Sequence, residues 1–394
     1  MSTAHTTKHV PQHDYYIGLM SGTSMDGADG VVVDLAGGDC KVVAHHSLPF
    51  SAALKTEMLA LNTAGSNELH RASFAANQLV LLYAQVVAGL LYTAEIESGD
   101  VMAIGAHGQT VRHAPSGSAA DGGGYTIQLN NPALLAERTG IDVVADLRSR
   151  DVAAGGHGAP LVPVFHKAVF GGSGGGAGQN IAMLNIGGIA NVSLLHADGR
   201  VEGFDTGPGN VLMDTWIEQH SGRAYDEHGA WAAAGEIVPP LLKKFLAESY
   251  FSNPIPKSTG RDLFHAAWLN AHCKSFMDLN PLLSKDYFPT CVQTTLAELT
   301  AQSVANAMRD YAVGFESLYV CGGGALNEYL MQRLRLAMPH IEIEATDVLG
   351  IPVMQVEAAA FAWLAKQCVD RVPLDLQKIT GARGSRVLGA VYPA

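Results

Sequence analysis

The sequence predicts an α/β protein whose two halves begin in the same way. Segments with strand periodicity alternate with segments of helical periodicity, which is typical of the α/β class. Residues 17–35 place an apolar strand, a turn rich in glycine and hydroxyl side chains, and a second apolar strand in close succession. Residues 181–195 repeat this organisation with different residues. We therefore expect a weak internal duplication, with halves at 15–170 and 180–394 and a Gly/Ser-rich loop between them.

The first half is expected to open with a hairpin, because a parallel crossover needs a dozen or more connecting residues. Short apolar runs predict further strands at 40–47, 101–106, 125–129 and 141–145. Helical spacing of apolar residues predicts a long helix at 68–94. A shorter helix is expected at 132–139, where Pro132 stands near the start.

The second half is expected to continue in the same alternation after its own opening hairpin. A strand at 200–202 leads to a glycine-rich loop and a helix at 210–219. An amphipathic helix at 295–313 precedes a buried strand at 318–321 and a helix at 325–338. The last helix, at 356–369, has the option of packing back on the first half.

Composition excludes several classes of protein. The 394-residue chain carries a net charge of −12 and no basic run, so nucleic acid and anionic membranes are not expected partners. Its apolar runs are interrupted before reaching the ~18–20 residues of a membrane span. Its five cysteines form no Cys-x-x-Cys pair, which suits a reducing compartment. Residues 1–14 lack the apolar core of a secretory signal and are expected to be a disordered tail, so we expect a cytoplasmic protein.

The turn of the first hairpin has the groups that hold a phosphate chain and its metal ion. It offers backbone N–H groups, hydroxyls at Ser21, Thr23 and Ser24, and the carboxylate of Asp26. Neither a Walker loop nor a dinucleotide-binding loop fits, because the turn carries no Gly-Lys-Ser/Thr and leads to a strand. An ordinary hairpin turn remains an alternative, since Gly, Ser and Asp are common in turns.

A second glycine turn follows the expected strand at 318–321. Gly322, Gly323 and Gly324 stand between that strand and a helix, where a ring or a phosphate could lie against backbone. Tight packing between strand and helix is the alternative explanation for the three glycines.

Asp205 is the strongest candidate for a catalytic group. It lies in a Gly/Pro-rich loop between a strand and a helix, at the mouth expected for an α/β ligand site. A carboxylate there can accept a proton from an attacking hydroxyl or water. Capping of the turn is the alternative role.

Several other polar residues are candidates for substrate contact. Arg150 could bind a carboxylate or phosphate, or pair with a neighbouring carboxylate. His107, Gln109 and Thr110 offer neutral donors and acceptors suited to sugar hydroxyls, although a loop histidine with satisfied bonds is also possible. Glu357 stands in an apolar helix, where a lone acid is costly to bury without a partner or a role.

Taken together, these motifs resemble the anhydro-N-acetylmuramic acid kinase family. The matching stretches run in family order at 18–27, 107–113, 131–137, 142–146, 150–156, 158–163, 185–188, 203–205, 207–214, 257–261 and 321–324. They cover the chain from about residue 16 to its end, which makes the resemblance more specific than any single motif. His157 departs from the family pattern, where relatives carry Gln, and puts fine substrate contacts in doubt.

The resemblance implies the two-domain actin-like (ribonuclease H-like) ATPase fold of sugar kinases, with duplicated domains and ATP in the cleft between them. It implies a Mg²⁺-dependent phosphotransferase that opens the 1,6-anhydro ring of anhydro-N-acetylmuramic acid with water and phosphorylates O6. The products would be N-acetylmuramic acid 6-phosphate and ADP, in cell-wall recycling. Family members are typically dimers, so a homodimer is expected.

The resemblance also assigns roles to residues. Asp205 matches the base that activates water, and Asp26 is expected to contact the metal. The sugar pocket is expected to contain His107, Gln109, Thr110, Arg150 and Glu357. ATP is expected to contact Gly22, Thr23, Ser24, Met25, Asp26, Gly27, Ala28, Asp29, Asn185, Gly187, Gly188, Gly322, Gly323 and Gly324.

Two other functions remain open at this stage. An ordinary sugar or carboxylate kinase of the same fold would attack the γ-phosphate with a substrate hydroxyl. An ATP-gated binding module would hydrolyse ATP slowly and without dependence on sugar.

Overall fold

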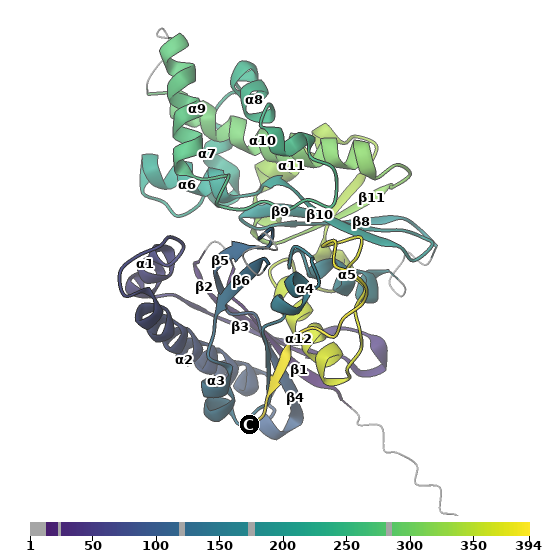
Figure 1. Ribbon diagram of the computed structural model, residues 1–394. Helices are drawn as coiled ribbons and strands as arrows, with labels where there is room; N and C mark the ends of the chain where they lie inside the picture. Colours follow the sequence, from purple (N-terminus) through teal and green to yellow (C-terminus); the bar gives the residue numbers. More distant parts are fainter. Residues whose placement is uncertain (1–12, 23–24, 118–122, 172–177, 281–285) are drawn as a thin grey trace, which may run out of the picture.

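The computed structural model describes residues 13–22, 25–117, 123–171, 178–280 and 286–394. It shows two large β-sheets, one in each half of the chain, with helices on their faces, and a small two-stranded sheet (Figure 1). Most of the expected tail at 1–14, and Thr23 and Ser24 of the first turn, lie outside the described residues. The mixed α/β class expected from the alternation of elements is confirmed.

The first sheet has the strand order β13-β7-β4-β1-β2-β3. Its strands are β1 (Tyr15–Met20), β2 (Gly27–Asp34), β3 (Lys41–Pro49), β4 (Val101–Ala106), β7 (Val143–Ala145) and β13 (Ala390–Tyr392). β1, β2 and β3 form an antiparallel meander, whereas β4 and β7 join in parallel. β5 (Gln109–Ala114) and β6 (Tyr125–Leu129) form a separate hairpin.

The second sheet repeats the five-strand order of the first. It runs β10-β9-β8-β11-β12, made of β8 (Ile181–Ile186), β9 (Ile189–Leu195), β10 (Val201–Pro208), β11 (Ser317–Cys321) and β12 (Glu342–Ala345). The first three strands are again an antiparallel meander, and β11 and β12 are again parallel to β8. This matches β3-β2-β1-β4-β7 in order and direction, so the duplication expected from the two hairpins is present.

Helices cover the sheets and bury apolar side chains against the strands or against one another. In the first half these are α1 (Ala52–Ala60), α2 (Glu68–Ala94), α3 (Pro132–Thr139), α4 (Ser149–Ala153) and α5 (Val162–Phe170). α2 buries Leu79, Tyr83, Val86 and Leu90 against one face of the first sheet. By length and composition α2 is the one helix among the described residues that could cross a membrane, but 44% of that window is buried in the protein.

The second half carries a larger helical layer. It comprises α6 (Val211–Ser221), α7 (Ala230–Ala233), α8 (Pro239–Leu246), α9 (Ala266–Leu279), α10 (Phe288–Tyr311) and α11 (Glu328–Ala337). α10 is central to this layer and packs against α6, α7, α8, α11 and β10. The largest apolar cluster of this half lies between these helices and the second sheet.

α12 (Val356–Val369) follows the second sheet in sequence but packs on the first, against β1, β2 and β4. Figure 1 shows its yellow ribbon in the lower half of the molecule. Its alanine-rich face lets the helix lie directly on the strands. A Cβ atom on Gly18 would collide with the carbonyl oxygen of Ala358, and one on Gly105 with that of Phe361.

Two elements are longer than expected, and two are shorter, including α11, which starts at Glu328 and not at 325. β10 extends to Pro208 because it pairs with β9, so Asp205 lies inside a strand and opposite Asn191. α10 begins at Phe288, seven residues before the expected start, where Pro289 and several threonines obscure the apolar periodicity. β7 starts at Val143.

Candidate active site

Asp205 sits near the end of β10, at a point where the register of β9 and β10 shifts. Its side chain is only 7% exposed. One carboxylate oxygen accepts from the backbone N–H of Thr259 at 2.9 Å, and its own N–H donates to the Lys257 carbonyl at 3.0 Å. The Tyr250 hydroxyl donates to the Asp205 carbonyl at 2.7 Å. The carboxylate is therefore held in place from the backbone of a neighbouring loop.

Burial changes the chemistry of this carboxylate. Loss of hydration raises the pKa of Asp205 to about 7, and the Thr259 hydrogen bond and the charges of Arg148 and Lys257 oppose this rise. A carboxylate with a pKa in this range is a much stronger base than a solvated one. The structure thus gives Asp205 the properties of a general base near neutral pH.

Arg148 lies close to this carboxylate and orients His107. Its Nε donates to His107 Nε2 at 3.0 Å, and its Nη1 donates to the Gly158 carbonyl at 2.6 Å. Because Nε2 accepts this bond, the proton of the neutral imidazole belongs on Nδ1. Burial, reinforced by the Arg148 charge, lowers the pKa of His107 to about 3, so the ring stays neutral. His107 follows β4 directly, as the sequence predicted for the start of this motif.

Glu357 brings α12 into the same site. Burial raises its pKa, while the Arg148 charge and a hydrogen bond from Asn185 lower it, and the Asp29 charge raises it. Asn185 is 3% exposed and is the penultimate residue of β8, so a residue of the second sheet and a residue of α12 meet here. Glu357 therefore lies near Asn185 and Arg148.

Two polar atoms beside Asp205 have no partner among the described residues. They are the Thr259 hydroxyl and the side-chain carbonyl of Asn191, which pairs with Asp205 across β9 and β10. Buried polar atoms are normally hydrogen-bonded. A polar ligand next to Asp205 would satisfy both.

The first hairpin turn is supported from below by Gln109. This side chain is completely buried; it accepts from the Ser21 hydroxyl and donates to the Gly22 carbonyl at 3.3 Å. These two bonds connect Gln109 to the turn. Thr110 accepts from Gln128 at 3.1 Å, in the β5–β6 hairpin.

The first hairpin turn is shorter than the phosphate-binding loop expected at residues 22–29. Gly27, Ala28 and Asp29 belong to β2, and the Ala28 side chain lies in the core. Met25 has a positive φ of 55° and closes the turn by donating from its N–H to the Gly22 carbonyl at 3.2 Å. The Asp26 carboxylate projects to solvent and pairs with Lys55 at 3.0 Å.

The other two glycine turns are built differently. Gly322 has a φ of 80°, and a Cβ atom there would meet Asn185, while one on Gly324 would meet Ile186. Close packing thus explains Gly322 and Gly324. Gly323 is exposed, and a Cβ atom there would make only an ordinary contact of 3.7 Å with the Asn210 side chain. At the β8–β9 turn, the carbonyls of Gly187 and Gly188 accept from Asn210 at 2.8 Å and Gly209 at 2.9 Å, which fixes the start of α6.

Arg150 does not lie among the buried polar residues around Asp205. It is exposed on α4, while Arg148, two residues earlier, contacts His107. The sequence analysis singled out Arg150 from the charged segment 146–151 as the substrate-binding arginine. The spacing of Arg148 and Arg150 does not show which of the two side chains points into the protein.

Sequence reasoning also gave no role to Asp214, Lys257 or Thr259, although each lies in a stretch that carried the family resemblance. Asp214, on α6, has its pKa raised to about 7 by burial and by the charge of Asp26 across the site, against the lowering effect of Arg261. Asp26 and Asp214 thus bring one carboxylate from each half toward the same region.

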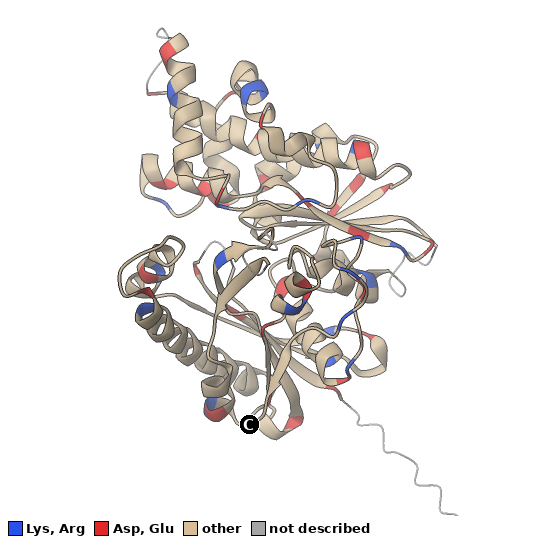
Figure 2. Ribbon diagram, viewed as in Figure 1, with Lys and Arg blue, Asp and Glu red and all other residues tan. Residues whose placement is uncertain are grey.

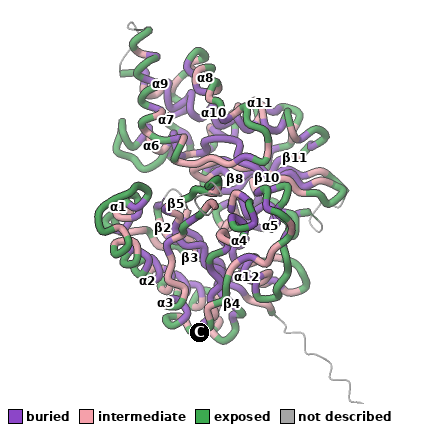
Figure 3. The backbone as a smooth tube through the Cα atoms, viewed as in Figure 1, coloured by how far each residue is buried: buried purple, intermediate pink, exposed green. Residues whose placement is uncertain are grey.

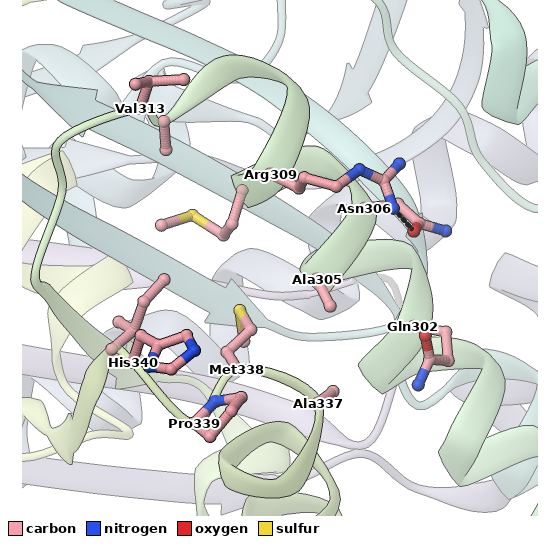
Figure 4. Close-up of a pocket in the computed structure, with 12 residues that line it drawn as sticks. Gln302, Ala305, Asn306, Arg309, Val313, Ala337, Met338, Pro339 and His340 are labelled. Atoms are coloured by element: carbon pink, nitrogen blue, oxygen red, sulfur yellow. Dashed lines mark hydrogen bonds between the residues drawn. The ribbon is translucent and has the colours of Figure 1, made fainter.

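A cavity of about 350 Å³ lies elsewhere, between the ends of α10 and α11 (Figure 4). Met338, Pro339 and His340 line one side, and Arg309, which donates to Asn306 at 2.8 Å, lies on the other. This cavity is at the amino ends of β11 and β12, whereas ligands of parallel sheets bind at the carboxyl ends. Asp205 therefore remains the candidate for the active site, and this cavity does not.

Comparison with known proteins identifies the family of the chain. Residues 14–394 match the family model described as anhydro-N-acetylmuramic acid kinase. The chain belongs to the anhydro-N-acetylmuramic acid kinase family. Proteins of this name from Bordetella pertussis and Albidiferax ferrireducens are 54% and 52% identical, over 100% and 97% of this chain and 100% of each relative.

Each half of the chain carries a sheet with the same strand order, which is the duplication expected from the sequence. Structures similar to the chain include an activator of 2-hydroxyisocaproyl-CoA dehydratase from Clostridium difficile (13% identity, TM-score 0.45) and a ROK family glucokinase from Streptomyces griseus (16%, 0.41). The activator matches over 92% of this chain and 99% of its own, and the glucokinase over 90% and 99%.

Proposed function

We propose that this chain is an ATP-dependent kinase that opens the 1,6-anhydro ring of anhydro-N-acetylmuramic acid and phosphorylates O6. The products are N-acetylmuramic acid 6-phosphate and ADP, in peptidoglycan recycling. The observation that carries the proposal is Asp205, a buried carboxylate with a pKa of about 7 held beside unpartnered polar atoms. The full-length match to proteins of this name supports the substrate.

Asp205 accepts a proton from water, whose oxygen forms a bond to C1 of the sugar as the C1–O6 bond breaks. O6 takes the γ-phosphoryl group, so phosphorus replaces the acid that other glycosidases use to protonate the leaving oxygen. Arg148 favours the ionised form of Asp205 and holds His107 as a neutral N–H donor. Glu357 would accept from the amino sugar, and Asn185, expected to contact ATP, hydrogen-bonds to the Glu357 carboxylate.

The first turn, from Ser21 to Asp26, is proposed to hold the phosphates of ATP, with Gly187 and Gly323 on the opposite side. The halves 15–170 and 180–394 would flank the nucleotide as its two domains. Mg²⁺ commonly uses one or two carboxylates together with phosphate oxygens. Asp26 fits this pattern as an exposed carboxylate at the turn, and the described residues hold no cluster of three His, Cys, Asp or Glu side chains. Mg²⁺ would neutralise phosphate charge there.

The proposal includes a cytoplasmic location and a homodimer. A location where muropeptide fragments and ATP meet suits the reaction, and the five free cysteines suit a reducing compartment.

The decisive experiment measures ADP release with anhydro-N-acetylmuramic acid and with N-acetylmuramic acid. We expect release with the anhydro sugar, with ¹⁸O from labelled water at C1 of the product. The Asp205→Asn protein should fold and bind ATP but lose this turnover. Release with N-acetylmuramic acid alone, or product without label, would instead identify an ordinary sugar kinase.

A further inference from the structure

Asp151 is a buried carboxylate to which the proposed reaction gives no role. It lies on α4 beside the exposed Arg150, and its side chain is 1% exposed. Figure 2 shows the acidic and basic residues of α4 as adjoining red and blue segments, and Figure 3 shows part of the same helix as buried. A carboxylate is costly to bury unless its oxygens are hydrogen-bonded. The partners of Asp151 therefore indicate what it does.

Both carboxylate oxygens of Asp151 accept hydrogen bonds from other segments of the chain. Oδ2 accepts from the backbone N–H of Gly158 at 2.7 Å, and Oδ1 accepts from the Thr380 hydroxyl at 2.7 Å. Hydrogen bonds to an ionised group are shorter and stronger than those between neutral groups. Because both oxygens have partners inside the protein, Asp151 joins two segments of the chain and does not face a ligand.

The loop at 154–158 is shaped to receive this carboxylate. A Cβ atom on Gly156 would collide with Asp151 Oδ2 and with the Thr380 hydroxyl, so a glycine is needed there. The backbone N–H of His157 also donates to the Thr380 carbonyl at 2.8 Å. The loop is thus held by α4 on one side and by the C-terminal segment on the other.

Gly158 connects Asp151 to the candidate active site. Its N–H donates to Asp151, and its carbonyl accepts from Nη1 of Arg148 at 2.6 Å. Arg148 in turn donates from Nε to Nε2 of His107 at 3.0 Å. A continuous chain of hydrogen bonds therefore joins the C-terminal segment to the guanidinium of Arg148 and the ring of His107.

We propose that Asp151 is a positioning residue for the reaction, which holds Arg148 near Asp205 through the backbone of Gly158. The proposal rests on the function put forward above and deepens it. Loss of hydration lowers the pKa of Arg148 to about 10, and the carboxyls of Glu357, Asp205 and Asp151 oppose this, so the guanidinium is charged at neutral pH. Its effect on Asp205 depends on distance, because a Coulomb interaction weakens as charges separate.

The test compares variants of the full chain. Asp151→Ala removes both the charge and the hydrogen bonds. Asp151→Asn removes the charge alone, because its side-chain carbonyl can accept from Gly158 and its amide can donate to Thr380. The Thr380 hydroxyl can then donate to the Leu376 carbonyl, at 3.2 Å. The control is Asp146→Asn, which makes the same change at an exposed carboxylate of the same segment.

The first measurement is kcat/KM for the anhydro sugar against pH. Asp151→Asn and Asp146→Asn should stay close to wild type. Asp151→Ala should lose about 100-fold, because a displacement of about 1 Å costs that much. Its rise in activity with pH should also move to higher pH, since Arg148 would leave Asp205 with only Lys257 as a nearby positive charge. Both variants at position 151 lack the charge, so a difference between them reports position.

The second measurement does not depend on activity. In protein labelled with ¹⁵N-histidine, the ring nitrogens of His107 report which of them carries the proton, and His107→Gln assigns their signals. Wild type and Asp151→Asn should keep the proton on Nδ1, because Arg148 donates to Nε2. In Asp151→Ala the two tautomers should mix and the pKa of His107 should rise, because the Arg148 charge that lowers it has moved away.

A folded Asp151→Ala protein with unchanged His107 signals and an unchanged pH profile would overturn the proposal and leave the proposed function standing. A wild type without sugar-dependent release of ADP would overturn the function, while the His107 signals would still show whether Asp151 holds Arg148. Circular dichroism checks folding. Should Asp151→Ala not fold, Asp151→Leu combined with Thr380→Val takes its place, because replacing both partners with apolar groups disturbs stability least. The same two results then decide.

Discussion

At the scale of single residues, Asp205 must be both basic and ionised, and burial favours the first property while opposing the second. Burial makes its carboxylate basic, but a carboxylate of pKa about 7 is largely protonated below neutral pH and then accepts nothing. Arg148 and Lys257 partly offset burial by favouring the ionised form. The balance between burial and these two charges sets the pH range in which the site can act.

This balance predicts the pH profile. The wild-type kcat/KM should rise with pH and level off above about 7, because Asp205 must be ionised to accept a proton. Arg148→Met removes a charge that lowers this pKa, so its acidic limb should shift to higher pH. The comparison is Arg150→Met, whose exposed side chain should leave the position of the limb unchanged. Identical limbs in wild type and Arg148→Met would contradict the assignment.

The same carboxylate should reduce stability. Because the folded pKa of about 7 lies above the ordinary 3.8, the native state binds the proton more tightly than the unfolded chain. The stability from this group is complete below pH 3.8 and is lost as pH rises through about 7. Asp205→Asn should therefore raise Tm by several degrees at pH 8 and by less at pH 5. A variant that is less stable at pH 8 would show that the charge is stabilising.

At the scale of elements, the site depends on how closely α12 lies on the first sheet. Gly18 in β1 and Gly105 in β4 leave no room for a Cβ atom beneath this helix, because backbone carbonyls of Ala358 and Phe361 fill the space. Glu357 is on the same helix turn as Ala358, so the depth of α12 fixes where the Glu357 carboxylate lies.

Gly18→Ala should test this contact. A methyl group would push against backbone that cannot rotate away, so we expect a loss of about 3 kcal/mol or more in the free energy of unfolding. Urea denaturation followed by circular dichroism measures it. Gly99→Ala is the matched control, because Gly99 has open space and an ordinary φ, and it should change stability little. Equal stability of the two variants would mean that α12 can shift.

Elements with strong periodicity were predictable, and elements shaped by partners were not. The helices at 68–94, 132–139 and 356–369 and the strand at 125–129 have the bounds that sequence predicted. The extension of β10 through Asp205 depends on pairing with β9, which no local pattern encodes. The depth of α12 on β1 likewise follows from two glycines far away in the chain.

At the scale of the whole molecule, the site is assembled from distant segments. His107 and Arg148 come from the first half, Asp205 and Asn185 from the second, and Glu357 from the helix that returns. The burial of the Asp205 and Glu357 carboxyls was predictable, since each acid stands in an otherwise apolar or glycine-rich segment. The role of Arg148 was not, because its contact with His107 exists only after the segments around 107 and 148 come together.

The first half should not fold without α12. A fragment of residues 13–170 would leave uncovered the face of its sheet that α12 buries, which includes Tyr16, Val31 and Ala103. We expect it to be insoluble, or to bind ANS and lack near-UV circular dichroism. Joining residues 351–394 to this fragment through a flexible linker should restore structure. A cooperative unfolding transition in the shorter fragment would contradict this expectation.

The return of α12 to the first sheet has a consequence during synthesis. β1 leaves the ribosome early, whereas the helix that covers it is made after nearly the entire second half. At about 5–20 residues per second, the interval between Phe170 and Val356 is about 10–40 s. During that time the apolar face of the first sheet is not yet covered by α12. We expect chaperones to bind this exposed face of the nascent chain. The final forty or so residues thus decide when the enzyme becomes a native protein.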